Sequence, residues 1–222
     1  MNQVGMQITR ARASDIPQIV EVHLDAFPDF FLSRLGTPFL HAYYSQVLHF
    51  EQGILLVSRE EASGQVIGFV AGFTAPAEFY SQMLRQAPRY VLPILRGFLT
   101  DHRLIGLVLN RLGHVIRGSR TGNAAKPESD RSGGCELSSI ATLHSRQGQG
   151  IGRHLLDAFL EEAAHYPVSY IYLTTDAEDN DPVNQFYQRA GFVLSRSFVT
   201  GKGRAMNEYR KAVNPDLSKT HA

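Results

Sequence analysis

A short glycine-rich segment, Gln147-Gly148-Gln149-Gly150-Ile151-Gly152-Arg153, lies between a strand-like stretch and an amphipathic, helix-like stretch. Glycines allow several backbone N–H groups to converge on one point, and the start of a helix adds a dipole that favours an anion. Arg146 and Arg153 add positive charge beside it. The pattern predicts a site for a phosphate or pyrophosphate group. A turn that only reverses the chain is the alternative with the same composition.

Two common phosphate-binding motifs do not fit this segment. A nucleoside triphosphate loop requires G-x-x-x-x-G-K-[ST], and no pair of lysine and hydroxyl residue follows the glycines. The dinucleotide fingerprint G-x-G-x-x-G fails because its third glycine arrives one residue early. That fingerprint also belongs after the first strand of a parallel sheet, whereas this segment comes two-thirds along the chain. A nucleotide-binding regulator is therefore supported by the glycines alone.

The elements that must position the glycine segment follow from the apolar pattern. Helices are expected at 16–27, 37–50, 151–165 and 182–190, and strands at 6–10, 53–58, 65–74, 136–142, 170–175, 192–198 and 205–213. The short polar connection 59–64 predicts an antiparallel hairpin. This order predicts an α/β fold in which helices pack on a mixed sheet.

Composition narrows the class of protein. The 222 residues suit one domain spanning 1–222, and the formal net charge of +1 argues against a nucleic-acid partner. The single cysteine, Cys135, excludes an internal disulfide and a cysteine-rich zinc site. With no signal peptide at the start, a cytoplasmic location is expected. The nine histidines are not paired at metal-ligand spacing, so we expect no metal.

Four segments of the chain resemble the GNAT superfamily, the GCN5-related N-acetyltransferases. Its coenzyme A signature [QR]-x-x-G-x-[GA] is matched by Gln147, Gly150 and Gly152, and residues 137–142 are similar to its fourth strand. Asn180 followed by the run 186–192 (F-Y-Q-R-A-G-F) is similar to its N-x(6)-Y-E-K-x-G-F segment, and residues 8–16 to its first strand and helix. The resemblance implies a mostly antiparallel central sheet flanked by helices. One departure is the long stretch between the third and fourth strands, where the family has a tight hairpin.

The resemblance also implies acetyl-CoA as co-substrate and assigns its contacts. Backbone groups of Ile140, Ala141 and Thr142 would pair with the pantetheine arm as a neighbouring strand does, and an N–H near Ile140 would stabilise the oxyanion. The segment from Gln147 to Arg153 would hold the pyrophosphate. Asn180 would bond either the pantetheine or the start of the next helix, where asparagine is also an ordinary cap.

Tyr187 is the candidate general acid, and it also belongs to the expected coenzyme A site. A phenol with a pKa near ~10 stays protonated at neutral pH and can protonate a leaving thiolate, whose thiol has a pKa of about 8–9. The alternative is an aromatic core residue beside Phe186. Since adjacent positions of a helix face different directions, one of the two aromatics must point away from the core.

A base must remove a proton from the amine before it attacks, because an ammonium group has no lone pair. Glu136, on the expected fourth strand, is the first candidate, acting directly or through water. Ser138 and His23 are lesser candidates, and a solvated strand end is the structural alternative for Glu136. Cys135 has no clear histidine partner in the sequence, so an acyl-enzyme on its thiol is not expected.

The predicted reaction is direct transfer of an acetyl group from acetyl-CoA to a primary amine of a small molecule, with an amino sugar as one candidate. A peptide or protein amine is an alternative acceptor, and a non-catalytic module that binds or senses coenzyme A is an alternative function. The acceptor site is expected at the aromatic residues Phe27, Phe30, Phe31 and Tyr43. We expect a monomer or a homodimer.

A helical insertion is expected at about 75–134, between the third and fourth strands. Its basic residues between 79 and 126 greatly outnumber its single acid, Asp101. Extra helices with a solvated basic face are one interpretation. The other is that the insertion attracts an anionic acceptor or makes a peripheral contact with an anionic membrane surface.

Overall fold

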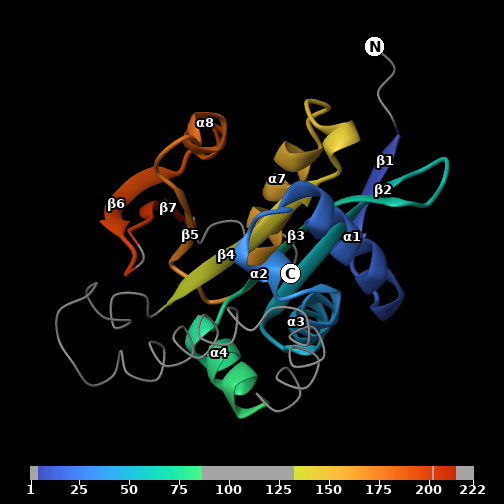
Figure 1. Cartoon of the computed structure of the whole chain (residues 1–222), viewed down its shortest axis with the longest axis horizontal. Helices are drawn as coiled ribbons and strands as arrows, with labels where there is room; N and C mark the ends of the chain where they lie inside the picture. Colours follow the sequence, from blue (N-terminus) through green and yellow to red (C-terminus); the bar gives the residue numbers. More distant parts are fainter. Residues whose placement is uncertain (1–4, 87–132, 202, 214–222) are drawn as a thin grey trace.

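The computed structural model describes residues 5–86, 133–201 and 203–213 (Figure 1). Its described helices are α1 (Ile16–Ala26), α2 (Phe31–Arg34), α3 (Thr37–His49), α4 (Pro76–Arg85), α7 (Ile151–Ala163) and α8 (Asp181–Arg189), with short 3-10 turns at Ala13–Asp15 and His144–Arg146. Its strands are β1 (Met6–Arg10), β2 (Gly53–Glu60), β3 (Val66–Phe73), β4 (Gly134–Thr142), β5 (Tyr170–Asp176), β6 (Val193–Val199) and β7 (Ala205–Ala212). The predicted α/β fold class is confirmed.

The seven strands form one sheet in the order β1-β2-β3-β4-β5-β7-β6. All neighbours pair antiparallel except β4 and β5, which are parallel. The hairpin expected across 59–64 is present as the β2–β3 pair. The sheet is therefore mixed and mostly antiparallel, and the glycine segment follows β4, one strand of the parallel pair.

Helices cover both faces of the sheet. On one face, α1, α3 and α4 pack against one set of β2 and β3 side chains, including Phe69 and Phe73. On the other face, α7 and α8 pack against the alternate set, including Ile54 and Ile67. Every residue of β3 is buried, which explains why its sequence is almost continuously apolar instead of alternating.

The predicted insertion is only partly described. Helix α4 begins directly after β3 at Pro76, and Phe79 of α4 stacks on Phe73 with ring centroids 4.1 Å apart. This helix therefore belongs to the core on the α1–α3 face. The rest of the expected insertion, including its basic residues beyond Arg85, lies outside the described residues.

Candidate active site

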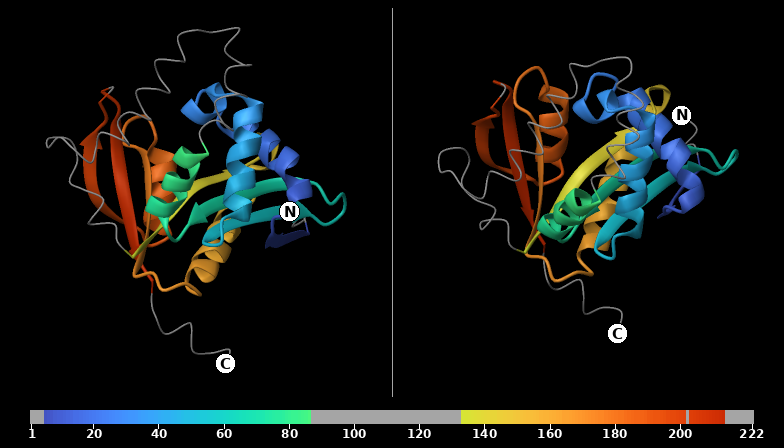
Figure 2. Two further views of the ribbon diagram at one scale, coloured as in Figure 1. Left: turned by 90° about the horizontal axis from the view of Figure 1, so that it is seen from below. Right: turned by 60° about the horizontal axis from the view of Figure 1, so that its bottom comes forward.

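Strands β4 and β5 are paired only at their first residues. Pairing joins Gly134–Glu136 to Tyr170–Tyr172, and beyond this point the two strands separate (Figure 2). A cavity of about 860 Å³ lies there, lined by residues 137–142 of β4 and 173–175 of β5. Because the β4 edge facing the cavity has no neighbouring strand, its backbone groups can pair with an extended ligand.

A bulge in β4 turns two consecutive serines toward the same helix. Ala71 of β3 pairs with Ser139 and Gly72 pairs with Leu137, so Ser138 is the extra residue. The Ser138 hydroxyl lies 2.6 Å from the Tyr43 hydroxyl of α3, and the side chain of Ser139 bonds to Tyr44. In a regular strand, these serines would face opposite sides of the sheet.

The glycine segment forms a turn that ends at the first residue of α7. Gly148 and Gly150 have φ angles of 75° and 79°, a left-handed conformation that side chains other than glycine rarely adopt. The N–H groups of Arg153 and His154 both donate to the Gly150 carbonyl. Among the described residues, no backbone acceptor is seen for the N–H groups of residues 148–152. The turn therefore presents a group of amide donors at a helix N-terminus, as an anion site requires.

Most of the residues predicted to hold coenzyme A line the cavity, namely Ile140, Ala141, Thr142, Gln147, Gly148, Gly152, Arg153, Asn180 and Tyr187. Gln149 and Gly150 are exposed members of the turn that are not part of the cavity wall. Ile151 is 3% exposed, and its side chain packs in the core with α7. Only its backbone can serve a ligand.

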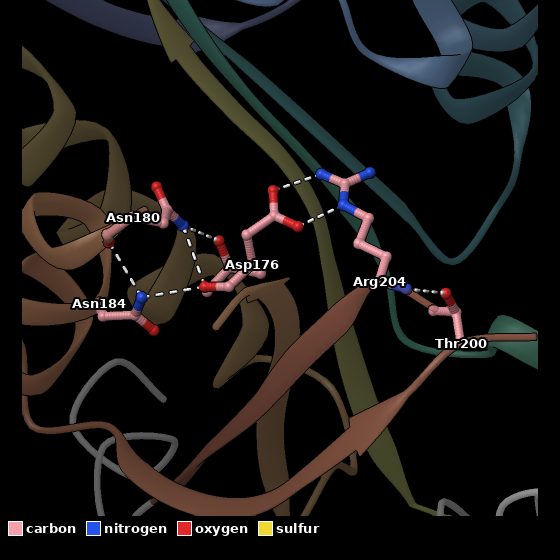
Figure 3. Close-up of polar contacts among 6 residues, drawn as sticks. Asp176, Asn180, Asn184, Thr200 and Arg204 are labelled. Atoms are coloured by element: carbon pink, nitrogen blue, oxygen red, sulfur yellow. Dashed lines mark hydrogen bonds and ion pairs between the residues drawn. The ribbon is translucent and has the colours of Figure 1, made fainter. Parts of the chain in front are cut away.

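The alternative role of Asn180 as a side-chain cap of α8 is wrong. Its amide nitrogen instead donates to the Thr175 hydroxyl at 2.8 Å and to the Asp176 carbonyl at 3.2 Å (Figure 3). Asn184, one turn further along α8, donates to the carbonyls of Asp176 and Asn180, both at 2.9 Å. The two asparagines therefore fix the start of α8 against the end of β5 and keep that side of the cavity in place.

Tyr187 is buried in the core and lines the cavity at the same time. Its ring contacts Phe186 and Phe192 edge-on, and it is 6% exposed. No hydrogen bond to its hydroxyl is seen within the described part of the chain. Burial raises the pKa of the Tyr187 hydroxyl, so the group keeps its proton at neutral pH. Tyr187 is therefore a core residue that also borders the cavity, and its role as the general acid stays a prediction.

Glu136 lies at the last paired position of β4, where the cleft begins, but it does not line the cavity. Its two carboxylate oxygens accept hydrogen bonds from the Tyr80 hydroxyl and the Tyr172 hydroxyl, both at 2.8 Å. Glu136 is therefore held by hydrogen bonds within a polar cluster. The alternative, a solvated side chain at the end of a strand, does not describe it. Its role as the base stays a prediction.

The aromatic residues expected at the acceptor site are divided between the cavity and the core. Phe27 and Phe30 line the cavity with ring centroids 5.0 Å apart. Tyr43 is 4% exposed and lies behind Ser138, which does line the cavity. Phe31 begins α2, and its side chain lies outside the described part of the structure.

Arg204, in the turn between β6 and β7, was not identified from the sequence. Its guanidinium binds the Asp176 carboxylate through two hydrogen bonds (Figure 3). The same guanidinium lies over the Phe30 ring, 5.2 Å from the centroid. Arg204 thus connects the β5 side of the cleft to the α1–α2 loop, a contact between distant segments that no local motif indicates.

The comparisons with known proteins agree with this geometry. The model of the Acetyltransferase (GNAT) family matches residues 16–192. The chain belongs to the GNAT acetyltransferase family. No curated protein matches the chain.

Solved GNAT structures share the fold at low sequence identity. An N-acetyltransferase from Staphylococcus aureus Mu50 is 14% identical, with a TM-score of 0.60 over 95% of this chain and 99% of that one. The yncA structure from Salmonella typhimurium, solved with its cofactor acetyl-CoA, is 15% identical, with a TM-score of 0.58 over 100% and 98%. The ribosomal-protein-S18-alanine N-acetyltransferase from Escherichia coli is 13% identical, with a TM-score of 0.57 over 95% of both chains.

The cleft of this GNAT protein fits acetyl-CoA, the acetyl donor of the family. Gly148 and Gly152 both line the cavity, and a Cβ on Gly148 would meet no atom within 4 Å. A Cβ on Gly152 would have only Phe186 at 4.0 Å. Side chains at these positions would therefore fill space beside the amide donors, and the two glycines leave that space open.

Two further features bear on this GNAT protein. Within the described residues, no helix is both long enough and apolar enough to cross a membrane. In that same part of the chain, no three His, Cys, Asp or Glu side chains are grouped so that they could hold a metal ion.

Cys135 is fully buried on β4, and burial raises the pKa of its thiol. Because the thiolate is the reactive form, we expect Cys135 to resist alkylation by iodoacetamide in the folded protein and to react after unfolding in guanidinium chloride. Mass spectrometry of the alkylated protein measures this. Modification of the native protein at the rate of a free thiol would contradict it, and a Cys135→Ala variant with wild-type kcat would exclude an acyl-enzyme on this residue.

Proposed function

We propose that this GNAT protein is an N-acetyltransferase that transfers an acetyl group from acetyl-CoA directly to a primary amine. The observation that carries the proposal is the position of Tyr187. It lines the same cavity as the glycine turn and the part of β4 that separates from β5. A protein that only binds coenzyme A has no need for a protonated phenol at this place. The retained hydroxyl therefore favours catalysis over sensing.

Acetyl-CoA supplies an activated acyl carbon as a thioester. In the reaction, the amine nitrogen forms a bond to this carbon, the carbon–sulfur bond breaks, and Tyr187 gives its proton to the departing sulfur. The nitrogen loses a proton as it becomes an amide, and transfer of this proton through water restores the Tyr187 hydroxyl. Burial raises the pKa of Tyr187, and it also disfavours a thiolate in the same cavity, which raises the pKa of the leaving thiol. The difference between the two pKa values therefore changes by less than the shift of Tyr187 alone. Backbone N–H groups on the unpaired edge of β4 stabilise the oxygen that becomes negative.

Glu136 remains our candidate for the base that removes the proton from the ammonium form of the acceptor. Its carboxylate lies where β4 and β5 begin to separate, and hydroxyls of Tyr80 and Tyr172 keep it oriented. Because Glu136 is outside the cavity wall, the proton reaches it through water or through these hydroxyls. Glu136→Gln should shift or abolish the acidic limb of the kcat/KM profile, which a pH series measures. An unchanged profile would assign the role to another group.

Release of free thiol from acetyl-CoA in the presence of an amine library tests the activity, with mass spectrometry of the acetylated product. The library should contain amino sugars, amino acid amides, peptides and aryl-alkyl amines, because the aromatic residues Phe27 and Phe30 do not by themselves select one of these classes. We expect amine-dependent thiol release. Tight binding of acetyl-CoA by calorimetry without thiol release would instead support the module that only binds coenzyme A.

A further inference from the structure

His23 of α1 is a buried histidine in the wall of the cavity. It is 2% exposed and lies among aromatic rings, with the Phe27 ring edge-on at 5.1 Å and the Tyr44 ring edge-on at 5.7 Å. An imidazole has two nitrogens, and each one loses its hydration when the ring is buried. A buried ring is stabilised only where protein groups replace that water.

Only one nitrogen of His23 has a partner. Nδ1 lies 2.6 Å from the Tyr44 hydroxyl, which also bonds to the side chain of Ser139. Nε2 is buried, and no described residue offers it a hydrogen bond. An unmet buried nitrogen destabilises the folded protein, and its residue borders a ligand cavity, so the nitrogen points to a partner that arrives with the ligand.

The protonation states of His23 and Tyr44 determine whether Nε2 donates or accepts a hydrogen bond. Burial lowers the pKa of His23 to about 4, so the ring is neutral at physiological pH and carries one proton. Burial also raises the pKa of Tyr44 well above its ordinary value, so its hydroxyl keeps its hydrogen. In a chain of imidazole, phenol and serine hydroxyl, the imidazole nitrogen is the strongest acceptor and the phenol the strongest donor. This order of strengths assigns Tyr44 as the donor to Nδ1, Ser139 as the donor to Tyr44, and Nε2 as the protonated nitrogen of the neutral His23 ring.

We propose that His23 binds the acceptor amine by donating a hydrogen bond from Nε2 to an oxygen atom that the acceptor carries near its amino group. The occupant is thus an oxygenated amine, such as an amino sugar or an α-amino amide, and not a plain alkylamine. His23 suits this purpose because it lines the half of the cavity formed by α1, together with Phe27 and Phe30. A neutral imidazole with such a low pKa is a poor base, so its contribution is recognition. The inference rests on the proposed transferase activity and specifies the acceptor for that same cavity.

Matched amines test the hydrogen bond. The oxygenated members are glucosamine, alanine amide and 2-methoxyethylamine, and the plain members are, in the same order, cyclohexylamine, 3-methyl-2-butylamine and butylamine. We expect wild-type kcat/KM, calculated per unprotonated amine because a nearby oxygen lowers the pKa of the ammonium group, to favour the oxygenated member by at least about 10-fold, because a site built around a donor leaves that donor unmet with the plain amine. Comparison of glucosamine with alanine amide shows whether the enzyme prefers an acceptor with hydroxyl oxygens or one with an amide oxygen.

Three variants locate the effect on Nε2. His23→Phe keeps a ring without nitrogen, His23→Asn keeps a polar group near the position of Nδ1, and His23→Gln keeps an amide donor near the position of Nε2. We expect the preference for the oxygenated amine to fall toward 1 in the Phe and Asn variants and to persist in the Gln variant. Acetyl-CoA affinity by calorimetry should stay within about twofold of wild type in all three.

A preference that is the same in His23→Phe as in wild type would overturn the inference, and so would equal loss in the Gln and Asn variants. If the Phe variant does not fold, the comparison of Gln with Asn still decides the question. A wild-type enzyme that acetylates both members of each pair equally well would also overturn it. A wild-type protein that acetylates no amine at all would instead remove the proposed function, so the two failures are distinguishable.

Discussion

Tyr187→Phe should lower kcat by roughly 10- to 10³-fold at saturating substrates, because the departing thiolate loses its proton donor. The ring of Tyr187 packs against Phe186 and Phe192, and phenylalanine preserves both contacts. No described residue bonds to the hydroxyl, so its removal leaves no partner unmet. The affinity for acetyl-CoA and the melting temperature should therefore stay close to wild type. Steady-state kinetics, calorimetry and thermal unfolding measure the three quantities.

Tyr209→Phe is the matched control for this substitution. Tyr209 is 1% exposed, and its ring centroid lies 6.3 Å from that of Tyr187, but it does not line the cavity. Its hydroxyl donates to the Asn184 side chain at 2.9 Å. Losing this bond should reduce the free energy of unfolding by about 1 kcal/mol and leave kcat within about twofold. If Tyr187→Phe behaves like Tyr209→Phe, with lower stability and normal kcat, Tyr187 is structural and water protonates the sulfur.

The order of strands and helices could be predicted because it depends on local patterns. Short apolar runs, with alternation in the strand at 6–10, located the strands to within two residues, and β2 and β3 were recognised as a hairpin from their short polar connection. The separation of β4 from β5 could not be predicted in this way. The composition of these segments, 137–142 and 173–175, is that of ordinary strands. Only the tertiary structure shows that the two segments do not pair with each other.

The candidate site was predicted best where backbone conformation determines the residue type. Gly148 and Gly150 have left-handed φ angles, so the sequence itself carries the geometry of the turn. Polar side chains were predicted less well, because asparagine and histidine serve several purposes. Asn180 occupies the N-cap position of α8, but its side chain binds the end of β5, and His23 was predicted only as a lesser candidate for the base. Only the tertiary contacts show that His23 lines the cavity with one nitrogen unmet.

Gly152→Val should weaken acetyl-CoA binding by about 10- to 10³-fold without unfolding the protein. Gly152 is a helical residue of α7 without a positive φ angle, and glycine is the worst helix former after proline, so valine costs no helix stability there. Its side chain would enter the cavity beside the amide donors and displace one or two charge-assisted hydrogen bonds to the pyrophosphate.

Gly150→Val separates this steric effect from backbone strain. Gly150 has a φ of 79°, which L side chains rarely adopt, so valine strains the turn although a Cβ there would lie at an ordinary contact distance of 3.7 Å from the His154 ring. We expect Gly150→Val to lower the melting temperature and Gly152→Val to leave it unchanged or higher. Calorimetry with acetyl-CoA and thermal unfolding of both variants measure the difference. Wild-type affinity in a folded Gly152→Val protein would show that the pyrophosphate does not bind at the start of α7.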